Sequence, residues 1–396
     1  MKEQRKVPQI RFKGFTDDWE QRKLGDIGDT FTGLSGKTKE DFGHGNAKFV
    51  TYMNVFSNPI SNINQVESVE VDYKQNEIKY GDIFFTTSSE TPEEVGMSSV
   101  WLDNKENNYL NSFCFGFRQF VKNDPYYMGY MLRNPMVRKN ITFLAQGISR
   151  YNISKNQMMN IEIPITNMEE QKLIGIFFKE IDNLITLHQR KCDKLVEVKK
   201  SLLEKMFPKN SSKIPEIRFK GFTDDWEQRK LEEIANRFDN LRIPIASNER
   251  EKGNIPYYGA NGIQDYVKGF THNGEYILVA EDGANDLKNY PVNYVNGPFW
   301  ANNHVHVLQS KENLSDSKFL KYCISKTDIE PLLVGGGRAK LNSNIMMSLS
   351  LKVPIKKEQD KIGTLFYEID NLITLHQRKL EKLKEVKKSM LERMFV

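Results

Sequence analysis

The sequence predicts an α+β protein with two globular domains separated by two long antiparallel coiled-coil helices, related by a pseudo-two-fold internal repeat. The segment IRFKGFTDDWEQRKL occupies residues 10–24 and returns unchanged at 217–231, which is 207 positions later. A second segment, EIDNLITLHQRK, occupies 180–191 and returns at 368–379. The stretches between these repeats share little likeness. The chain therefore consists of a constant frame around two variable middles.

The repeats set the predicted domain boundaries. Each repeat unit consists of a leading segment, a variable middle and a long helix, in that order. A period this long indicates duplication of a whole domain with its helix, because solenoid repeats are much shorter. We predict domains at 1–168 and 209–356, with leading segments at 7–24 and 214–231, and helices at 169–208 and 357–396.

The long repeated segments have the pattern of amphipathic helices. Their apolar residues recur at spacings of three and four, close to a heptad, and no glycine or proline interrupts 180–207. A helix from about residue 170 to residue 206 would be roughly 55 Å long. Neither apolar stripe can be buried alone, so we expect the two helices to pair, with His188 and His376 packed in the seam. The predicted seam comprises Ile181, Leu184, Ile185, His188, Leu195, Val198, Leu202 and Met206, and Ile369, Leu372, Ile373, His376, Leu380, Leu383, Val386, Met390 and Met394.

The variable middles have the pattern of short strands followed by a helical stretch. Alternating β-rich runs occur at 79–89 and 112–120 in the first middle, and at 275–283 and 304–308 in the second. Helical stretches follow near 125–144 and 315–333. Two equivalent domains with opposite orientations match the two-fold geometry of duplex DNA, so each domain could bind half of one site. The net charge of +5 permits nucleic-acid binding without proving it.

The frame motifs resemble the specificity subunit of type I restriction-modification systems. The leading phrase PxIRFKGFTDDWEQRKL follows Val7 and Ile214, and a P-I…E-Q pattern ends each domain at 164–171 and 354–359. The resemblance implies two target-recognition domains that read a bipartite, asymmetric DNA site. It also implies that the conserved helices bind two methyltransferase subunits, which recruit the restriction subunits. The chain itself would be no enzyme and hold no cofactor or metal, because S-adenosylmethionine and ATP would bind to the partner subunits.

Two glycine-rich loops at equivalent places in the dissimilar middles are candidate DNA contacts. Glycine permits close backbone approach, and the arginines and lysines there can contact phosphate or guanine. The alternative is a structural turn whose arginine pairs internally. Polar loop residues, including Thr86 and Asn285, are weaker candidates because such residues also form ordinary loops. The predicted DNA-binding residues are Arg150, Lys155, Arg338, Lys340, Thr87, Ser88, Ser89, Glu90, Glu281, Asp282, Asn302, Asn303 and His304.

Other apolar residues of the frame are candidates for docking. We interpret Phe12, Phe15 and Trp19 as anchors that hold the leading segment on the helices or on a partner. Leucines that lie off the predicted seam could contact the methyltransferase subunits. These predicted partner-binding residues are Leu187, Leu203, Leu375 and Leu391.

The rival interpretation is a fused DNA methyltransferase or nuclease with its own active site. TGLSGKT at 32–38 has Phe31 where a phosphate-binding loop needs glycine, and NDPYY at 123–127 lacks the second proline of an amino-methyltransferase box. His304 and His306 lack an evident third ligand for a metal. A protein-binding coiled-coil scaffold is a second rival. Three scattered cysteines and the lack of an apolar leader or spanning segment predict a cytoplasmic protein.

Overall fold

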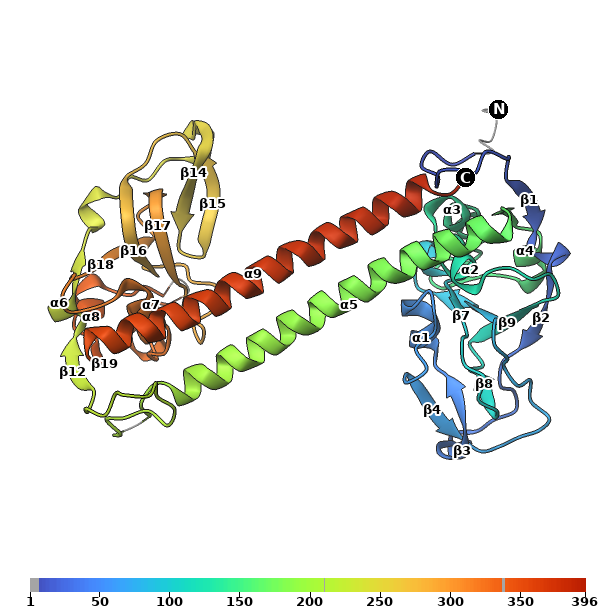
Figure 1. Cartoon of the computed structure of the whole chain (residues 1–396), viewed down its shortest axis with the longest axis horizontal. Helices are drawn as coiled ribbons and strands as arrows, with labels where there is room; N and C mark the ends of the chain where they lie inside the picture. The colour runs from blue at the N-terminus through green and yellow to red at the C-terminus, as the bar shows by residue number, and fades with distance from the viewer. Residues whose placement is uncertain (1–6, 210, 337–338) are drawn as a thin grey trace. The chain divides into compact units, whose positions relative to one another are not determined.

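The computed structural model describes residues 7–209, 211–336 and 339–396, which fall into two compact units. The first unit comprises Met1–His188 with Lys379–Val396, and the second comprises Gln189–Arg378. Each unit therefore contains one globular domain and a part of each long helix. Figure 1 shows the elements of both.

The first domain is built on two small sheets. One has four antiparallel strands in the order β2-β9-β5-β7, and the other has the order β4-β3-β8, in which β3 and β8 are parallel. The strands of these sheets are β2 (Gly28–Thr32), β3 (Phe42–Val50), β4 (Val66–Val69), β5 (Ile83–Thr86), β7 (Ser98–Val100), β8 (Asn108–Leu110) and β9 (Cys114–Gln119). The helices are α1 (Tyr52–Ser57), α2 (Pro125–Met131), α3 (Pro135–Phe143) and α4 (Lys155–Met159), with short 3-10 turns η1 (Leu24–Asp26), η2 (Lys39–Asp41) and η3 (Pro92–Glu94).

Strand β5 is buried on both faces and separates two cores. Ile83 and Phe85 point into the larger core with α2, whereas Phe84 points into a smaller core beside Trp101. This alternation follows from the two-residue period of a strand. The run predicted at 79–89 thus contains a strand with no solvent-facing side, which is why every residue of β5 is apolar or small.

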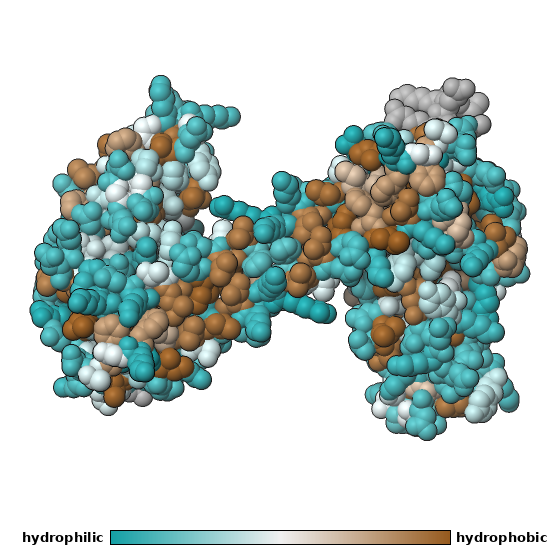
Figure 2. Space-filling view, viewed as in Figure 1, coloured by the Kyte–Doolittle hydropathy of each residue, from teal (hydrophilic) through white to brown (hydrophobic). Residues whose placement is uncertain are grey.

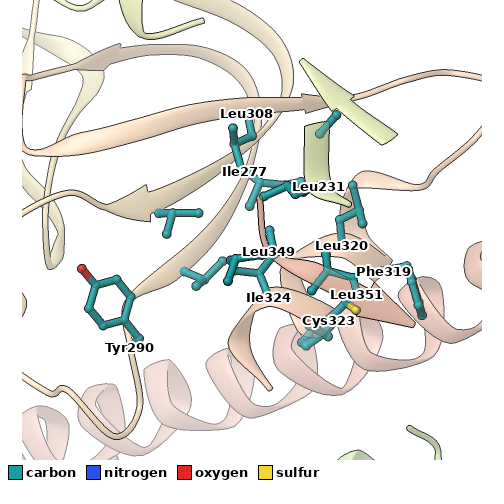
Figure 3. Close-up of a cluster of buried hydrophobic side chains, with 14 of the residues drawn as sticks. Leu231, Ile277, Tyr290, Leu308, Phe319, Leu320, Cys323, Ile324, Leu349 and Leu351 are labelled. Atoms are coloured by element: carbon teal, nitrogen blue, oxygen red, sulfur yellow. The ribbon is translucent and has the colours of Figure 1, made fainter. Parts of the chain in front are cut away.

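The second domain has one six-stranded sheet in the order β13-β18-β16-β17-β14-β15. Helix α7 packs on this sheet, and Figure 3 shows its residues Phe319, Leu320 and Cys323 in a core with Leu349 and Leu351. The sheet strands are β13 (Ala235–Arg237), β14 (Lys252–Gly259), β15 (Gly262–Val267), β16 (His272–Ala280), β17 (Val292–Ala301) and β18 (Val305–Ser310). The helices are α6 (Leu231–Ile234), α7 (Ser317–Ser325) and α8 (Ser343–Met347), with 3-10 turns η4 (Asp239–Leu241), η5 (Ser247–Glu249) and η6 (Glu330–Leu332).

The repeated leading segments make the same contacts in both units. Strand β1 (Glu20–Lys23) pairs with β11 (Glu162–Ile165), and β12 (Glu227–Lys230) pairs with β19 (Ser350–Val353). In both cases the pairing is antiparallel and closes the domain at the point where its long helix begins. The frame is therefore a structural unit as well as a sequence repeat.

Arginine–glutamate pairs fix each leading segment to its long helix. Arg11 donates to both carboxylate oxygens of Glu170 at 2.6 and 2.9 Å, and Arg218 donates to both oxygens of Glu358 at 2.8 Å. Both glutamates are fully buried. The predicted anchor Trp19 is also buried, because it packs in the core of the first unit.

Aspartates cap the helices that follow each middle. Asp124 accepts from the Tyr127 amide at the start of α2, and Pro125 lies in the first turn of this helix. Asp316 accepts from the Phe319 amide at the start of α7 in the same way. The helical stretch predicted at 125–144 is split into α2 and α3, because Pro135 starts a new helix capped by Asn134.

The two long helices are α5 (Met168–Lys205) and α9 (Lys356–Arg393), each of 38 residues. In the second unit, Cys192 contacts the carbonyl of Ile373 and Lys199 pairs with Asp370, so residue numbers rise along α5 as they fall along α9. The helices are therefore antiparallel there, as predicted. The first unit agrees, because Phe178 stacks on Phe395 while Asp182 pairs with Lys387.

The predicted seam is correct only in part. Ile181, Ile369 and Leu380 are buried, but Leu184, Val198 and Leu372 are exposed. Cys192, which the heptad assignment left out, is buried and contacts α9. Because a free cysteine packs as a small apolar residue, counting Cys192 among the apolar positions would have revealed its place in the seam.

All three cysteines are buried and free. Within the described part of the chain, no helix combines the length and apolar character needed to cross a lipid bilayer.

Candidate nucleic-acid interface

Three loops meet at the same place in both domains, although the domains differ in sheet structure. In the first domain, the backbone of Thr87 accepts from the Ile153 amide at 3.0 Å and donates to the Phe113 carbonyl at 3.1 Å. In the second, the backbone of Glu281 accepts from the Leu341 amide at 2.7 Å and donates to the His304 carbonyl at 2.9 Å. The loops after β5 and β16 are thus equivalent, and most predicted DNA-binding residues lie on or beside them.

The two glycine-rich loops have the same closure. Gln146 and Asn152 exchange two backbone hydrogen bonds at 2.9 and 2.8 Å, and Val334 and Lys340 exchange two at 2.9 Å. A Cβ on Gly147, whose φ is +150°, would lie 2.0 Å from the Arg150 carbonyl oxygen, so this turn needs glycine. The structure confirms that these loops occupy equivalent places, as the sequence predicted.

The first domain carries an open pocket of about 790 Å³ at this point. Its wall combines aromatic, hydroxyl and charged side chains, and it brings together four of the predicted residues. The lining residues are Tyr52, Met53, Phe56, Ser88, Ser89, Glu90, Glu94, Phe113, Ser149 and Arg150.

Arg150 lies over the floor of this pocket. Its Nε and Nη2 donate to the Ser88 hydroxyl at 3.3 and 3.1 Å. Ser88 belongs to the short strand β6 (Ser88–Ser89), which pairs with β10 (Tyr151–Asn152). Because Tyr151 follows Arg150 directly, this pairing fixes the backbone next to Arg150 against Ser88 and Ser89. The Tyr52 hydroxyl donates to the Ser88 carbonyl at 2.8 Å and attaches α1 to the same strand.

The other two predicted residues of the first domain are engaged within the fold. The Thr87 hydroxyl donates to the Phe113 carbonyl at 2.8 Å. The Lys155 ammonium lies 5.9 Å from the centre of the Phe115 ring, and Lys155 does not line the pocket. The structure therefore places Ser88, Ser89, Glu90 and Arg150 together, with Lys155 apart from them.

In the second domain the corresponding loops are joined by an ion-pair network. Glu281 accepts from Arg242 at 2.6 Å and from Lys340 at 2.7 Å. Burial alone would raise the pKa of Glu281, but these two hydrogen-bonding cations outweigh it and lower the pKa. Asp282 pairs with His304 at 2.6 Å. The network holds Lys340 against the strand ends, so four predicted residues again lie together.

His306 is buried beneath this network and joins it to the glycine-rich loop. Its Nδ1 lies 2.8 Å from an Asp239 carboxylate oxygen, and its Nε2 lies 2.8 Å from the Leu341 carbonyl oxygen. Burial alone would raise the pKa of Asp239, but the hydrogen bonds from His306 and the Val307 amide, with nearby Arg242, lower it. His306 is therefore a buried structural residue, and it does not lie on the surface together with His304.

Asp239, Glu281 and His306 place potential metal-ligating atoms within 4.8 Å of one another. Arg242 already lies 2.6 Å from Glu281 and 3.7 Å from Asp239. A cation inside the carboxylate pair occupies the electrostatic role that a metal would have, so this group is accounted for as an ion-pair network.

The remaining predicted residues of the second domain differ in exposure. Asn302 is only 4% exposed, and its Oδ1 accepts from the His304 amide at 2.8 Å. Asn111 makes the same contact with Phe113 in the first domain, so Asn302 shapes the loop from inside. Asn303 is exposed beside it. Asn285 is held to Asn261 by its backbone, and Arg338 lies outside the described residues.

The four predicted partner-binding leucines fall into two pairs. Leu187 and Leu375 are each 45% exposed and occupy equivalent positions on α5 and α9. Figure 2 shows apolar side chains gathered along the long helices. Leu203 and Leu391 instead pack against the cores of the second and first units. These two leucines help to seat the helix ends on the domains, which argues against a partner-facing role for them.

Sequence reasoning missed Tyr52, Phe56 and Arg242. Tyr52 and Phe56 stack with ring centres 5.9 Å apart on α1, which Thr51 caps. Their spacing of four on a short helix was a usable signal for one shared face. Arg242 gave no signal, because only the folded chain brings it to Glu281.

Two dissimilar domains in one frame, each with three loops at the same place, define a protein with two recognition surfaces. A sequence model of the type I restriction modification DNA specificity domain matches residues 16–197 and again residues 223–385. The chain belongs to this family of type I restriction-modification specificity subunits.

Relatives agree with this assignment. A putative type I restriction enzyme specificity subunit of Haemophilus influenzae is 43% identical over 154 residues, and this match spans 39% of either chain. The putative MjaX specificity subunit of Methanocaldococcus jannaschii is 25% identical over 404 residues, covering 95% of this chain and 92% of the relative. The crystal structure of the type I S subunit from M. genitalium has a similar fold, with a TM-score of 0.71 and 17% identity over 98% of this chain and 99% of that one.

Proposed function

We propose that each domain reads one half of a bipartite, asymmetric DNA site through its three converging loops. The observation that carries this proposal is the equivalence of the two loop clusters in domains that share almost no sequence. A constant backbone arrangement with different side chains is what two readers of different short sequences require. The exposed polar and basic groups of each cluster would divide between phosphate contacts for register and base contacts for specificity.

We further propose that the chain is non-catalytic and acts in the cytoplasm within a complex. Methylation and cleavage, with S-adenosylmethionine and ATP, would belong to methyltransferase and restriction subunits. The motifs considered for catalysis support this division, because Asp124 of NDPYY is used as a helix cap. The matched exposed leucines Leu187 and Leu375 support two equivalent docking faces, and hence two methyltransferase subunits.

The test is to exchange one variable middle and map the methylated bases. The chain is produced with its methyltransferase subunit in a host without other type I systems, and modified sites are located genome-wide. Residues 25–160, which include all three loops, are then replaced by the corresponding segment of another specificity subunit. We expect one half of the methylated site to change and the other half to stay the same.

The reciprocal exchange of residues 232–348 is the control, and it must change the other half only. Loss of methylation with both exchanges, in a complex that still assembles, would contradict independent reading by the two domains. Methyl transfer by the purified chain alone would contradict its non-catalytic assignment.

A further inference from the structure

We infer that Arg150 and Glu90 read a G·C pair in the half-site of the first domain, with Arg150 on the guanine and Glu90 on the cytosine. This inference rests on the proposed function, because it assigns a base pair to the pocket of the first domain. It adds the two residues that determine specificity and the base pair that they select.

Arg150 is held in place while several of its donors stay unused. Ser88, whose hydroxyl accepts from both Nε and Nη2 of Arg150, is only 7% exposed and is fixed by the β6–β10 pairing. Among the described residues, no carboxylate lies within 4.0 Å of the Arg150 guanidinium. A preoriented guanidinium with free N–H groups suits the O6 and N7 acceptors of guanine, which take two hydrogen bonds from one arginine.

The charge of the pocket favours a base edge over a phosphate. Its wall carries one cation, Arg150, and two carboxylates, Glu90 and Glu94. A phosphate at this place would gain one attraction and meet two repulsions of similar range. The edge of a base pair carries no net charge, so the same wall admits it. An arginine that served only to hold the DNA backbone would be expected among other cations.

The two carboxylates have different tasks. Glu94 accepts from the Ser89 hydroxyl at 3.1 Å, and Ser89 is itself buried, so Glu94 is tied to the wall. Glu90 is exposed, and within the described chain it has no hydrogen bond or ion pair. A free carboxylate accepts from the N4 amino group of cytosine and from no group of a phosphate. Glu90 is therefore suited to the base that pairs with the guanine.

Aromatic side chains complete the pocket and explain why these contacts would be selective. Tyr52 and Phe56 form one stacked wall, and Phe113 is 59% exposed on the rim. Apolar surface that closes on a base edge displaces water from the polar contacts. A base with the wrong donors and acceptors then leaves buried groups unpaired, which is costly.

The experiment measures binding of the chain, assembled with its methyltransferase subunits, to a duplex library randomised over the half-site of the first domain. Arg150→Gln, Glu90→Gln and the control Glu93→Gln are compared with the unaltered chain. Glu93 is a neighbouring exposed carboxylate that does not line the pocket. Affinity for the selected site is also measured at several salt concentrations.

We expect Arg150→Gln to lose roughly 10- to 100-fold in affinity for the selected site, with the salt dependence unchanged and the preference for guanine lost at one position. Glu90→Gln should still prefer guanine through Arg150 but should discriminate less strongly against other base pairs at this position, because a neutral amide accepts more weakly from the cytosine amino group than a carboxylate does. Glu93→Gln should behave like the unaltered chain.

The inference is overturned if Arg150→Gln weakens all sequences equally and lowers the salt slope by about one unit, which is the behaviour of a phosphate contact. It is equally overturned if both pocket variants select the same sequences as the unaltered chain. Failure of the unaltered complex to select any sequence would instead contradict the proposed function, so the two failures are distinguishable.

Discussion

The ammonium group of Lys199 on α5 lies 2.6 Å from a carboxylate oxygen of Asp370 on α9. The internal repeat places the equivalent pair, Lys387 on α9 and Asp182 on α5, in the first unit at 2.5 Å. In each unit a tyrosine of the globular domain donates to the same aspartate, Tyr322 to Asp370 and Tyr130 to Asp182. Each aspartate thus joins three elements: both long helices and the domain that rests on them.

The two pairs should differ in strength, because Asp370 has an additional partner. Lys321 lies 3.0 Å from Asp370, whereas among the described residues Asp182 has only Lys387 and Tyr130. Lys387→Met should cost about 2 kcal/mol of unfolding free energy and Lys199→Met about 1 kcal/mol, since removing one partner leaves the charge of a partly buried aspartate less compensated. Denaturant unfolding of the two variants measures this difference. Equal losses would show that Lys321 does not compensate.

The paired tryptophans of the leading segments offer a second matched comparison. Trp19 donates through Nε1 to Glu170 at 3.1 Å, whereas the buried Nε1 of Trp226 has no hydrogen-bond partner within the described residues. Both side chains are 2% exposed, so their apolar burial is similar. Trp19→Phe should therefore destabilise its unit by about 1–2 kcal/mol more than Trp226→Phe destabilises the other.

Thermal and denaturant unfolding of both tryptophan variants provide the measurement. The remaining three tryptophans serve as fluorescence reporters in each variant. If Trp226→Phe proved the more costly change, the Trp226 indole would have to make a stabilising contact in solution.

The second domain should lose stability in acid through Asp239. The pKa of Asp239 lies below its ordinary value, so its ionised form stabilises the fold. That contribution is complete above the ordinary carboxyl pKa near 4 and is lost as the pH falls through the lower pKa of the folded state. Asp239→Asn should therefore be less stable than the unaltered chain at pH 7, and the difference should shrink below about pH 4.

Unfolding measured from pH 7 to pH 3 checks this prediction. Asp328→Asn is the control, because Asp328 is an exposed loop aspartate of the same domain. A stability difference that stayed constant over this range would show that the charge of Asp239 contributes nothing.

The frame could be predicted from the sequence because its information is local and present twice. The identical leading segments and the similar long helices indicated the domain order and the antiparallel pairing. The seam was less accurate, because Leu184 was assigned to it and is exposed, whereas Cys192 was left out and is buried. A leucine that faces a partner protein and one that faces the fold have the same side chain, and only packing separates them.

The sequence predicted several residues of the candidate site, but it did not predict how they are arranged in space. Ser88, Glu90 and Arg150 were each chosen as polar or basic loop residues, and the structure brings them to one pocket. What joins them is the long-range pairing of β6 with β10, which two-residue strands do not reveal in sequence. Asn302 was predicted on the same grounds, but its side chain is buried. Sequence alone does not distinguish an asparagine that shapes a loop from one that contacts a base.

The exposed leucines of the long helices yield the last prediction, which concerns partner assembly. Leu187→Gln and Leu375→Gln replace half-exposed leucines by a good helix former, so each should change stability by less than about 0.5 kcal/mol. If each leucine lies at the centre of a docking face, either variant should lower the affinity for one of the two methyltransferase subunits by at least about tenfold. The double variant should then bind neither subunit tightly.

Leu203→Ala distinguishes loss of a partner contact from loss of the fold. Leu203 packs against the core of the second unit, so this variant should be destabilised by about 1–2 kcal/mol. Once folded, it should still bind both subunits. Analytical ultracentrifugation of the reconstituted complex gives the ratio of methyltransferase to specificity subunits for each variant. Two bound methyltransferase subunits with the Leu187→Gln and Leu375→Gln double variant, at unaltered affinity, would remove these leucines from the docking faces.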